Sequence, residues 1–146
     1  MTNETMRKFG YPDSLVHDYE HWAVLLRPAQ VTLGSLILAA KSDATAFGQL
    51  PSNAFAELAA VTRDIEATLL GELAYEKINY LMLMMVDPHV HFHVIPRYSG
   101  SRALDQVTME DSSWPGPPDL KSARLLEPKA MEQLRNRFQR NWFTNH

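Results

Sequence analysis

Residues 87–97 have the sequence Asp-Pro-His-Val-His-Phe-His-Val-Ile-Pro-Arg, which places three of the chain's six histidines within five positions. Successive side chains of a β-strand point to opposite faces of the sheet. A strand over residues 89–95 is therefore predicted to project His89, His91 and His93 from one face. The apolar residues that alternate with them would face the packed interior.

Three adjacent imidazoles suit chemistry at phosphorus. Imidazole titrates near neutral pH, and neighbouring imidazoles discourage one another's protonation, so one ring stays neutral and nucleophilic while another carries a proton. A neutral nitrogen can form a covalent bond to phosphorus, and a second histidine can protonate the departing oxygen. Two other interpretations remain open on spacing alone: a zinc or copper site, and a cluster of histidines with structural roles.

The rest of the chain predicts an α+β domain built on an antiparallel sheet. Strands are expected over residues 20–27, 31–40 and 77–86, in addition to 89–95. A long helix is expected over residues 53–70, with Gly71 as its stop. A last helix is expected to begin near Pro128, because proline is favoured in a first turn.

Composition narrows the class of protein. The 146 residues fit one compact domain, and the absence of cysteine excludes disulfides and cysteine nucleophiles. The net charge of −3 argues against a general nucleic-acid binder. No apolar stretch is long enough to span a membrane, and residues 1–10 lack the apolar core of a signal peptide. We therefore expect a cytoplasmic protein with no membrane or nucleic-acid partner.

The histidine stretch resembles the signature of the histidine triad (HIT) superfamily, His-φ-His-φ-His-φ-φ, where φ is apolar. Val94 and Ile95 fill the last two positions, and Pro-Arg follows as in many members. The resemblance extends over residues 20–98 and includes Leu33-Gly34 before an apolar strand. It implies a HIT-like antiparallel sheet with a long helix packed on it. We expect a single domain over residues 1–146, with a core at 20–98 and an extension with a helical tail at 99–146.

By this resemblance His91 is the nucleophile that attacks the α-phosphate of a nucleotide derivative and carries the nucleotidyl group until water or another acceptor releases it. His89 and His93 would orient the phosphate, set the tautomer of His91 and assist the leaving group. The implied substrates are dinucleoside polyphosphates or nucleotide phosphoramidates. No metal or other cofactor is implied, and many members are homodimers that pair through the helix and a neighbouring strand.

The chain departs from the family pattern at three places. Ser35 stands where many members have a supporting histidine, and Arg27 stands where many have an asparagine. Residues 84–87, Met-Met-Val-Asp, replace a polar run that contacts phosphate in other members. The methionines are predicted to belong to the core. This change keeps a second hypothesis open, a nucleotide-binding module with weak or absent catalysis.

Four further residues are predicted to bind substrate, each with a structural alternative. Asn79 is expected to contact nucleotide or brace the triad, and Arg27 to contact phosphate or ribose. Gln30 lies in a turn that can reach the site. Arg97 can pair with phosphate, although a structural salt bridge is the favoured interpretation of its place at a strand end. Trp114, in a loop rich in proline, would either stack on a base or pack on the core.

Overall fold

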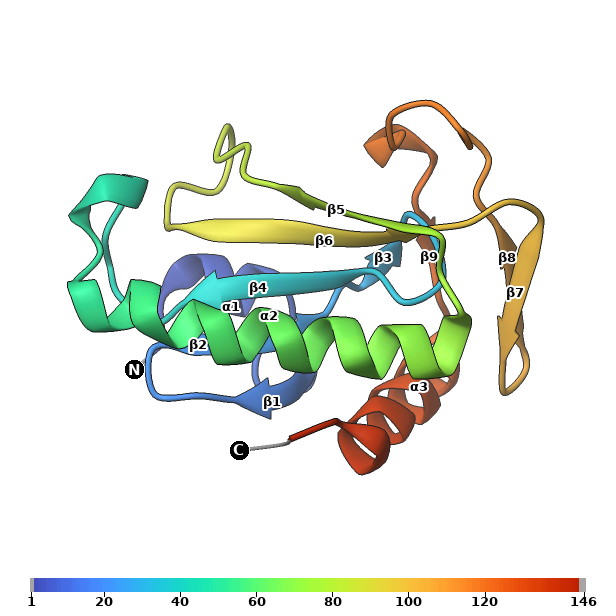
Figure 1. Cartoon of the computed structure of the whole chain (residues 1–146), viewed down its shortest axis with the longest axis horizontal. Coiled ribbons are helices and arrows are strands. Elements are labelled where there is room, and N and C mark those ends of the chain that lie inside the picture. The colour runs from blue at the N-terminus through green and yellow to red at the C-terminus, as the bar shows by residue number, and fades with distance from the viewer. Residues whose placement is uncertain (1, 145–146) are drawn as a thin grey trace.

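The computed structural model describes residues 2–144 of the chain (Figure 1). In chain order the elements are α1 (Glu4–Lys8), β1 (Leu15–Asp18), β2 (Trp22–Leu26), β3 (Ala29–Gln30), β4 (Leu36–Ala40), the 3₁₀ helix η1 (Phe47–Gln49), α2 (Ser52–Leu73), β5 (Lys77–Leu81), β6 (His91–Arg97), β7 (Ser101–Leu104), β8 (Val107–Glu110), the 3₁₀ helix η2 (Leu120–Ser122), β9 (Arg124–Leu125) and α3 (Pro128–Asn141).

Five strands form one sheet in the order β1-β2-β4-β6-β5, and every neighbouring pair is antiparallel. This confirms the predicted α+β class with an antiparallel sheet. The triad strand β6 lies inside the sheet, between β4 and the edge strand β5. His93 pairs with Ile37 of β4 on one side and with Leu81 of β5 on the other.

The two faces of the sheet carry different layers. Helix α2 lies across one face (Figure 1), and its buried Val61, Ile65 and Leu69 belong to the same apolar cluster as Val90 and Val94 of the triad segment. The short helix α1 covers part of the other face, where Met6 belongs to a second, smaller cluster. The apolar residues of the motif thus anchor β6 to α2, and the histidines of β6 face the side that α1 covers.

Three strand predictions need correction. The expected strand over 31–40 contains only β4 as a strand, because Gly34 has a φ of 97° in a tight turn. A Cβ at this glycine would lie 2.4 Å from Cδ1 of Leu73, so the turn packs directly on the end of α2. The expected strand over 89–95 is β6, which begins two residues later, at His91.

The expected buried strand over 77–86 is also shorter and less buried than predicted. β5 ends at Leu81, and a loop follows in which Met85 and Val86 are 87% and 80% exposed. Met84 packs partly on the core, but the prediction that both methionines belong to the core is wrong for Met85. An edge strand with a loop rich in apolar residues has the same composition as a buried strand, which explains the error.

The helix predictions hold with small changes. The long helix extends past Gly71 to Leu73 and ends where Ala74 takes the left-handed conformation. The last helix begins at Pro128 as predicted, and its Leu134 and Phe138 are buried. No helix within residues 2–144 has the length and apolar character needed to cross a membrane.

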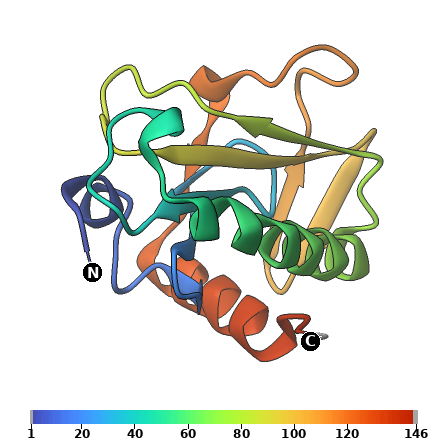
Figure 2. The same cartoon turned by 60° about the vertical axis from the view of Figure 1, so that its left-hand side comes forward.

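The C-terminal part of the chain wraps around the sheet (Figure 2). A β7–β8 hairpin follows the triad strand, β9 pairs with β3, and α3 packs beside β1. Trp142, just after α3, donates a hydrogen bond from Nε1 to the hydroxyl of Tyr19 at 2.8 Å. Residues 99–144 therefore complete the outer layers around the core.

Candidate active site

His91 is the first residue of β6 and is almost fully buried, with 1% of its surface exposed. Its Nδ1 lies 2.8 Å from the backbone carbonyl oxygen of His89. A carbonyl oxygen can only accept, so Nδ1 carries the hydrogen and donates it. The remaining ring nitrogen of neutral His91, Nε2, therefore has a free lone pair. This is the tautomer that a nitrogen nucleophile needs.

His93 is held as the opposite tautomer. Nε of Arg27 donates to Nδ1 of His93 at 3.3 Å, which leaves the ring hydrogen of the neutral imidazole on Nε2. Burial, together with the charge of Arg27 and the neighbouring His91, lowers the pKa of His93 from 6.5 to about 4, and Asp87 opposes this shift. His93 is therefore a neutral hydrogen-bond donor at physiological pH, suited to a phosphate oxygen.

His89 differs from the prediction that all three imidazoles extend from one strand. It lies in the bend before β6, and its Nδ1 is 2.9 Å from the hydroxyl oxygen of Thr5 in α1. The backbone N–H of His89 also donates to that hydroxyl oxygen, at 3.3 Å. His89 is thus placed by the N-terminal helix rather than by the sheet. No sequence motif marked Thr5 for this role.

The N-terminal segment also covers the imidazoles. The ring centroid of Phe9 lies 5.5 Å from that of His91 and 5.9 Å from that of His93. Helix α1 is fixed beside them by the side chain of Asn3, which donates to the carbonyl oxygens of Ala40 and Ser42. Phe9 thus contributes to the burial of His91, and it was not identified from the sequence.

Gln30 occupies a structural position. It is fully buried, and its carboxamide oxygen accepts from the backbone N–H groups of Gly34 and Ser35 at 2.8 and 3.1 Å. Its nitrogen donates to the carbonyl oxygens of Arg27 and Ser35. The side chain closes the turn between β2 and β4. The same turn positions Arg27 next to His93.

Asn79 and Arg97 are joined to each other and to the segment after β8. The guanidinium of Arg97 donates to Asp111 at 2.7 and 3.2 Å, to Oδ1 of Asn79 at 2.8 Å, and to Ser113 and the carbonyl oxygen of Gly116. Both members of the Arg97–Asp111 ion pair are buried. This is the structural salt bridge that the sequence left as an alternative for Arg97. Sequence reasoning did not identify Asp111.

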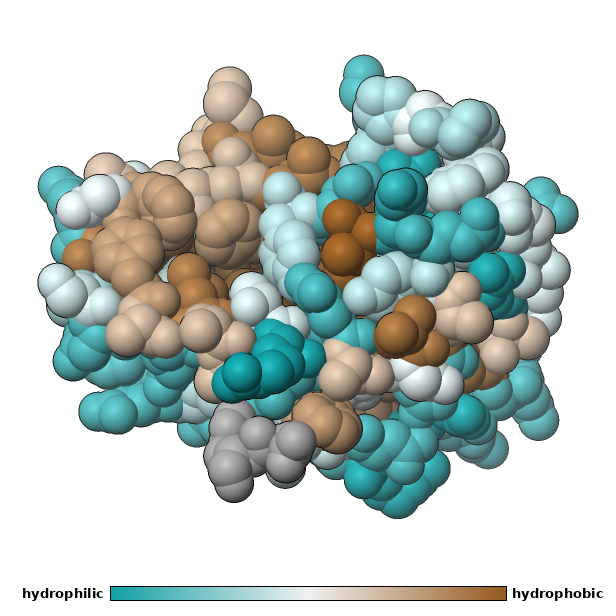
Figure 3. Space-filling view, viewed as in Figure 1, coloured by the Kyte–Doolittle hydropathy of each residue, from teal (hydrophilic) through white to brown (hydrophobic). Residues whose placement is uncertain are grey.

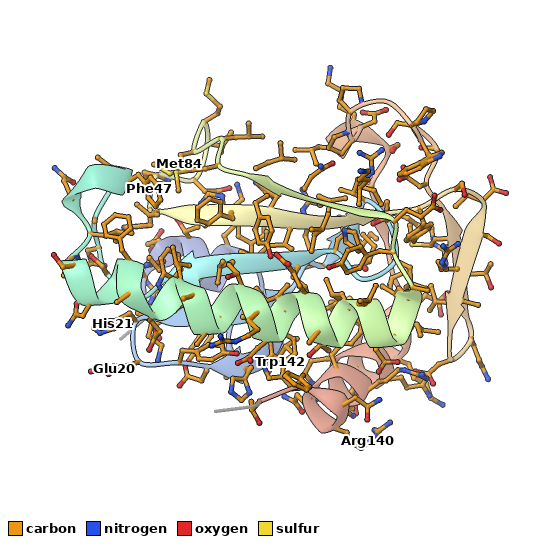
Figure 4. All side chains as sticks on the ribbon, in the orientation of Figure 1. Glu20, His21, Phe47, Met84, Arg140 and Trp142 are labelled. Carbon is orange, nitrogen blue, oxygen red and sulfur yellow. The ribbon has the colours of Figure 1, made fainter. Side chains whose placement is uncertain are left out.

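The run before the triad forms an apolar surface. Figure 3 shows apolar side chains gathered on the side of the molecule that carries η1 and the loop between β5 and β6, and Figure 4 shows Phe47 and Met84 at this end of the sheet. Phe47 contacts Phe92 of β6 edge to face, with ring centroids 5.7 Å apart.

The loop between β5 and β6 also contains an ion pair. Asp87 pairs with Lys8 of α1 at 2.8 Å, which is a second contact that holds the helix beside the triad segment.

Within residues 2–144 no three His, Asp or Glu side chains lie where they could together hold a metal ion. His91 and His93 have ring centroids 5.1 Å apart and are T-shaped to each other, and His91 already donates from Nδ1.

No family model and no curated protein matches the chain. Solved structures do match it. A histidine triad protein from Sinorhizobium meliloti has a TM-score of 0.74 and 22% identity over 97% of this chain and 96% of its own. One from Marinobacter aquaeolei has a TM-score of 0.74 and 18% identity over 97% and 95% of the two chains.

A third match is a hypothetical histidine triad nucleotide-binding protein from Sulfolobus tokodaii. It has a TM-score of 0.65 and 20% identity over 88% of this chain and 82% of its own. At identities of 18–22%, the structural similarity shows a shared fold and nothing more specific. The chain therefore has the fold of the histidine triad proteins, and its own His89, His91 and His93 supply the motif of that family.

Proposed function

We propose that the protein is a nucleotide hydrolase or nucleotidyl transferase that acts at the α-phosphate of a nucleotide derivative, through a covalent nucleotidyl intermediate on His91. The observation that carries this proposal is the hydrogen bond from Nδ1 of His91 to the carbonyl oxygen of His89, which leaves Nε2 as a nucleophile. The nucleotide-binding description of the Sulfolobus tokodaii protein, which shares the fold, supports the substrate class.

In the first step the lone pair of Nε2 of His91 attacks the α-phosphorus and forms a P–N bond. The bond from phosphorus to the leaving group breaks, and its electron pair departs with that group. His89, when protonated, gives its proton to the departing atom. The imidazolium that forms on His91 keeps its Nδ1 hydrogen on the carbonyl oxygen of His89, which stabilises the positive charge.

In the second step water attacks the same phosphorus. His89, now neutral, accepts a proton from the water, and the P–N bond breaks with its electron pair returning to Nε2 of His91. A nucleoside monophosphate leaves, and both histidines regain their starting states. A different hydroxyl or amine acceptor in place of water gives nucleotidyl transfer by the same route.

Two neighbouring groups would hold the phosphate. Nε2–H of neutral His93 donates to a phosphate oxygen, and the guanidinium of Arg27 supplies positive charge beside it. Burial of Arg27 lowers its pKa, but a guanidinium remains charged in proteins. Arg27 therefore takes the place of the neutral residue that the family pattern would put there.

The test uses wild-type protein and two variants. We expect wild type to cleave a dinucleoside polyphosphate or an adenylyl phosphoramidate and to accumulate an acid-labile adduct visible by mass spectrometry. His91→Ala should lose both the cleavage activity and the adduct, with turnover lower by on the order of 10³-fold or more. His21→Ala, outside the triad, serves as the control. Equal turnover by wild type and His91→Ala rejects the assignment of the nucleophile.

A nucleotide-binding module without catalysis is the second candidate. It is favoured by the apolar loop at residues 84–86, which offers no polar side chain to phosphate, and by the burial of His91 under Phe9. This candidate predicts nucleotide binding by calorimetry with no turnover across a panel of substrates. Turnover that depends on His91 eliminates it.

We further propose that the protein acts in the cytoplasm as a homodimer. Within residues 2–144 no strand pairs with the outer edge of β5, and helix α2 exposes the apolar side chains of Phe55 and Leu70. Such a strand edge and apolar side chains are suited to pairing with a second copy. Light scattering after gel filtration should give twice the monomer mass, and a monomer at micromolar concentration contradicts this.

A further inference from the structure

Helix α1 lies at the end of the sheet where β6 begins (Figures 1 and 2), and its Thr5 contacts His89 twice. Thr5 is buried, and its Oγ1 lies 2.9 Å from Nδ1 of His89. The same oxygen accepts the backbone N–H of His89 at 3.3 Å. One hydroxyl therefore fixes both the backbone and the ring of this histidine.

The contact with Thr5 decides which ring nitrogen of His89 is available for proton transfer. Nδ1 is engaged by the hydroxyl, and no other side chain within residues 2–144 bonds to this ring. Nε2 is therefore the ring nitrogen left for exchange with a substrate. In the two steps of the proposed reaction, His89 loses a proton to the leaving group and later accepts one from water.

A hydroxyl oxygen suits both states of His89 in that cycle. Of its two lone pairs, one accepts the backbone N–H of His89 and the other can accept Nδ1–H. Nδ1 carries its hydrogen in the charged imidazolium and also in the neutral tautomer whose Nε2 has a lone pair. The hydrogen bond to Thr5 can therefore stay in place while a proton leaves and returns at Nε2. An uncharged hydroxyl also lets the imidazolium release its proton, whereas a carboxylate would favour the charged form.

Helix α1 holds this hydroxyl in a fixed position. The side chain of Asn3 accepts from the backbone N–H of Met6 at 3.0 Å and donates to the carbonyl oxygens of Ala40 and Ser42, both at 3.0 Å. Met6 is fully buried in the smaller apolar cluster on this side of the sheet. Thr5 lies between these two anchors in the sequence. An orienting group needs this kind of support to hold an imidazole in one geometry.

We propose that Thr5 is a positioning residue for His89: it keeps the ring hydrogen on Nδ1 and so reserves Nε2 for the proton transfers to the leaving group and from water. Thr5 touches no reacting atom in this scheme and acts only through His89. This inference rests on the proposed function, in which His89 is the acid and the base. It makes the N-terminal helix part of the active site, although the helix lies outside residues 20–98, which carry the family resemblance.

The kinetic test removes the hydroxyl while keeping the size of the side chain. Thr5→Val should slow adduct formation from saturating dinucleoside polyphosphate by about tenfold, which is part of the full effect of a general acid. Thr5→Ser keeps the hydroxyl and should restore most of the rate. The p-nitrophenyl ester of a nucleoside monophosphate has a leaving group that needs no proton, so Thr5→Val should form the adduct from it at nearly the wild-type rate.

Thr62→Val is the matched control, because the hydroxyl of Thr62 donates to the carbonyl oxygen of Leu58 within α2, away from the triad. A loss confined to the polyphosphate substrate and rescued by Thr5→Ser supports the proposal. Equal losses with both substrates would mean that Thr5 acts through the general structure of the site, and they overturn the proposal, as does no loss with either substrate.

A spectroscopic test separates this inference from the catalytic proposal, because it needs no turnover. NMR of isotopically labelled imidazole nitrogens at alkaline pH reports which ring nitrogen carries the hydrogen, and the signals of His89 are those missing from His89→Gln. Wild type and Thr5→Ser should show the hydrogen of neutral His89 on Nδ1. Thr5→Val should move it to Nε2, the tautomer that free histidine prefers.

That result supports the role of Thr5 even if wild type cleaves neither substrate, in which case only the catalytic proposal fails. A hydrogen on Nε2 in wild type, or the same tautomer in wild type and Thr5→Val, rejects the role of Thr5 whether or not the protein is active. Thermal melting of each variant checks that it is folded.

Discussion

Nδ1 of His91 and the backbone carbonyl oxygen of His89 are joined by a hydrogen bond of 2.8 Å, so the backbone rather than a side chain sets the tautomer of the nucleophile. A side-chain substitution at position 89 therefore leaves this backbone hydrogen bond to His91 intact. The side chain of His89 is free for a separate role and is placed by Thr5. This division allows the roles of the two residues to be tested separately.

His89→Gln should impair departure of the leaving group but not attack by His91. General acid catalysis contributes about 10²–10⁴-fold, so we expect a loss of on the order of 100-fold with a dinucleoside polyphosphate. With a p-nitrophenyl ester of a nucleoside monophosphate, whose leaving group needs no proton, formation of the adduct should slow severalfold at most, although its release, in which His89 is the base, slows more. Rapid-quench measurement of the first turnover with both substrates checks this, and equal losses in the rate of adduct formation would show that His89 is not the acid.

The low pKa of His93 predicts a loss of stability in mild acid. The unfolded chain binds this proton near pH 6.5, and burial beside Arg27 delays protonation in the folded state until about pH 4. The unfolded state thus holds more protons between these values, and the free energy of unfolding falls as the pH drops through them. His93→Gln should remove about 1–2 kcal/mol of this fall between pH 7.5 and 4.5.

Urea denaturation at the two pH values measures this difference, with His21→Gln as the control. If the free energy of unfolding falls equally in wild type and His93→Gln, His93 is not the cause of the loss of stability in mild acid.

The Arg97–Asp111 pair should behave as a structural brace. Each single substitution, Arg97→Met or Asp111→Asn, leaves a buried polar partner without its counterpart and is expected to cost about 3–5 kcal/mol for the charge that remains. The double variant should cost less than the sum of the two. Chemical denaturation of the four proteins gives the coupling energy, and single costs below about 1 kcal/mol would contradict the assignment.

Phe9 should limit access to the nucleophile. Its ring packs against both buried imidazoles, and such aromatic contacts contribute about 0.5–1.5 kcal/mol beyond burial. Phe9→Ala is therefore expected to speed modification of His91 by diethyl pyrocarbonate roughly tenfold. Peptide mass spectrometry follows the rate at His91, with Phe143→Ala as the control. An unchanged rate would show that some other motion controls access.

Local patterns predicted much of the fold. His91 and His93 share a face, and Val90 and Val94 belong to the core, because the period of an extended chain is set by its backbone. The long helix and the start of α3 followed from apolar spacing and from Pro128. These features depend on residues that are close in sequence.

Contacts between distant residues were not predictable in this way. Thr5 meets His89 across 84 positions, and Asp111 meets Arg97 from a segment with no periodic pattern. Gln30 was predicted to bind substrate, yet all its described bonds close a turn, because a buried carboxamide must satisfy both its oxygen and its nitrogen. Such roles depend on the folded arrangement rather than on spacing.

The most direct test of the account is to locate the covalent intermediate. Wild-type protein is mixed with a dinucleoside polyphosphate, quenched in alkali to preserve a phosphoramidate, digested and sequenced by mass spectrometry. The account predicts one nucleotidyl group on His91, absent from His91→Ala protein and slower to disappear in His89→Gln. Turnover with no adduct at His91, or an adduct on His89 or His93 instead, would contradict it.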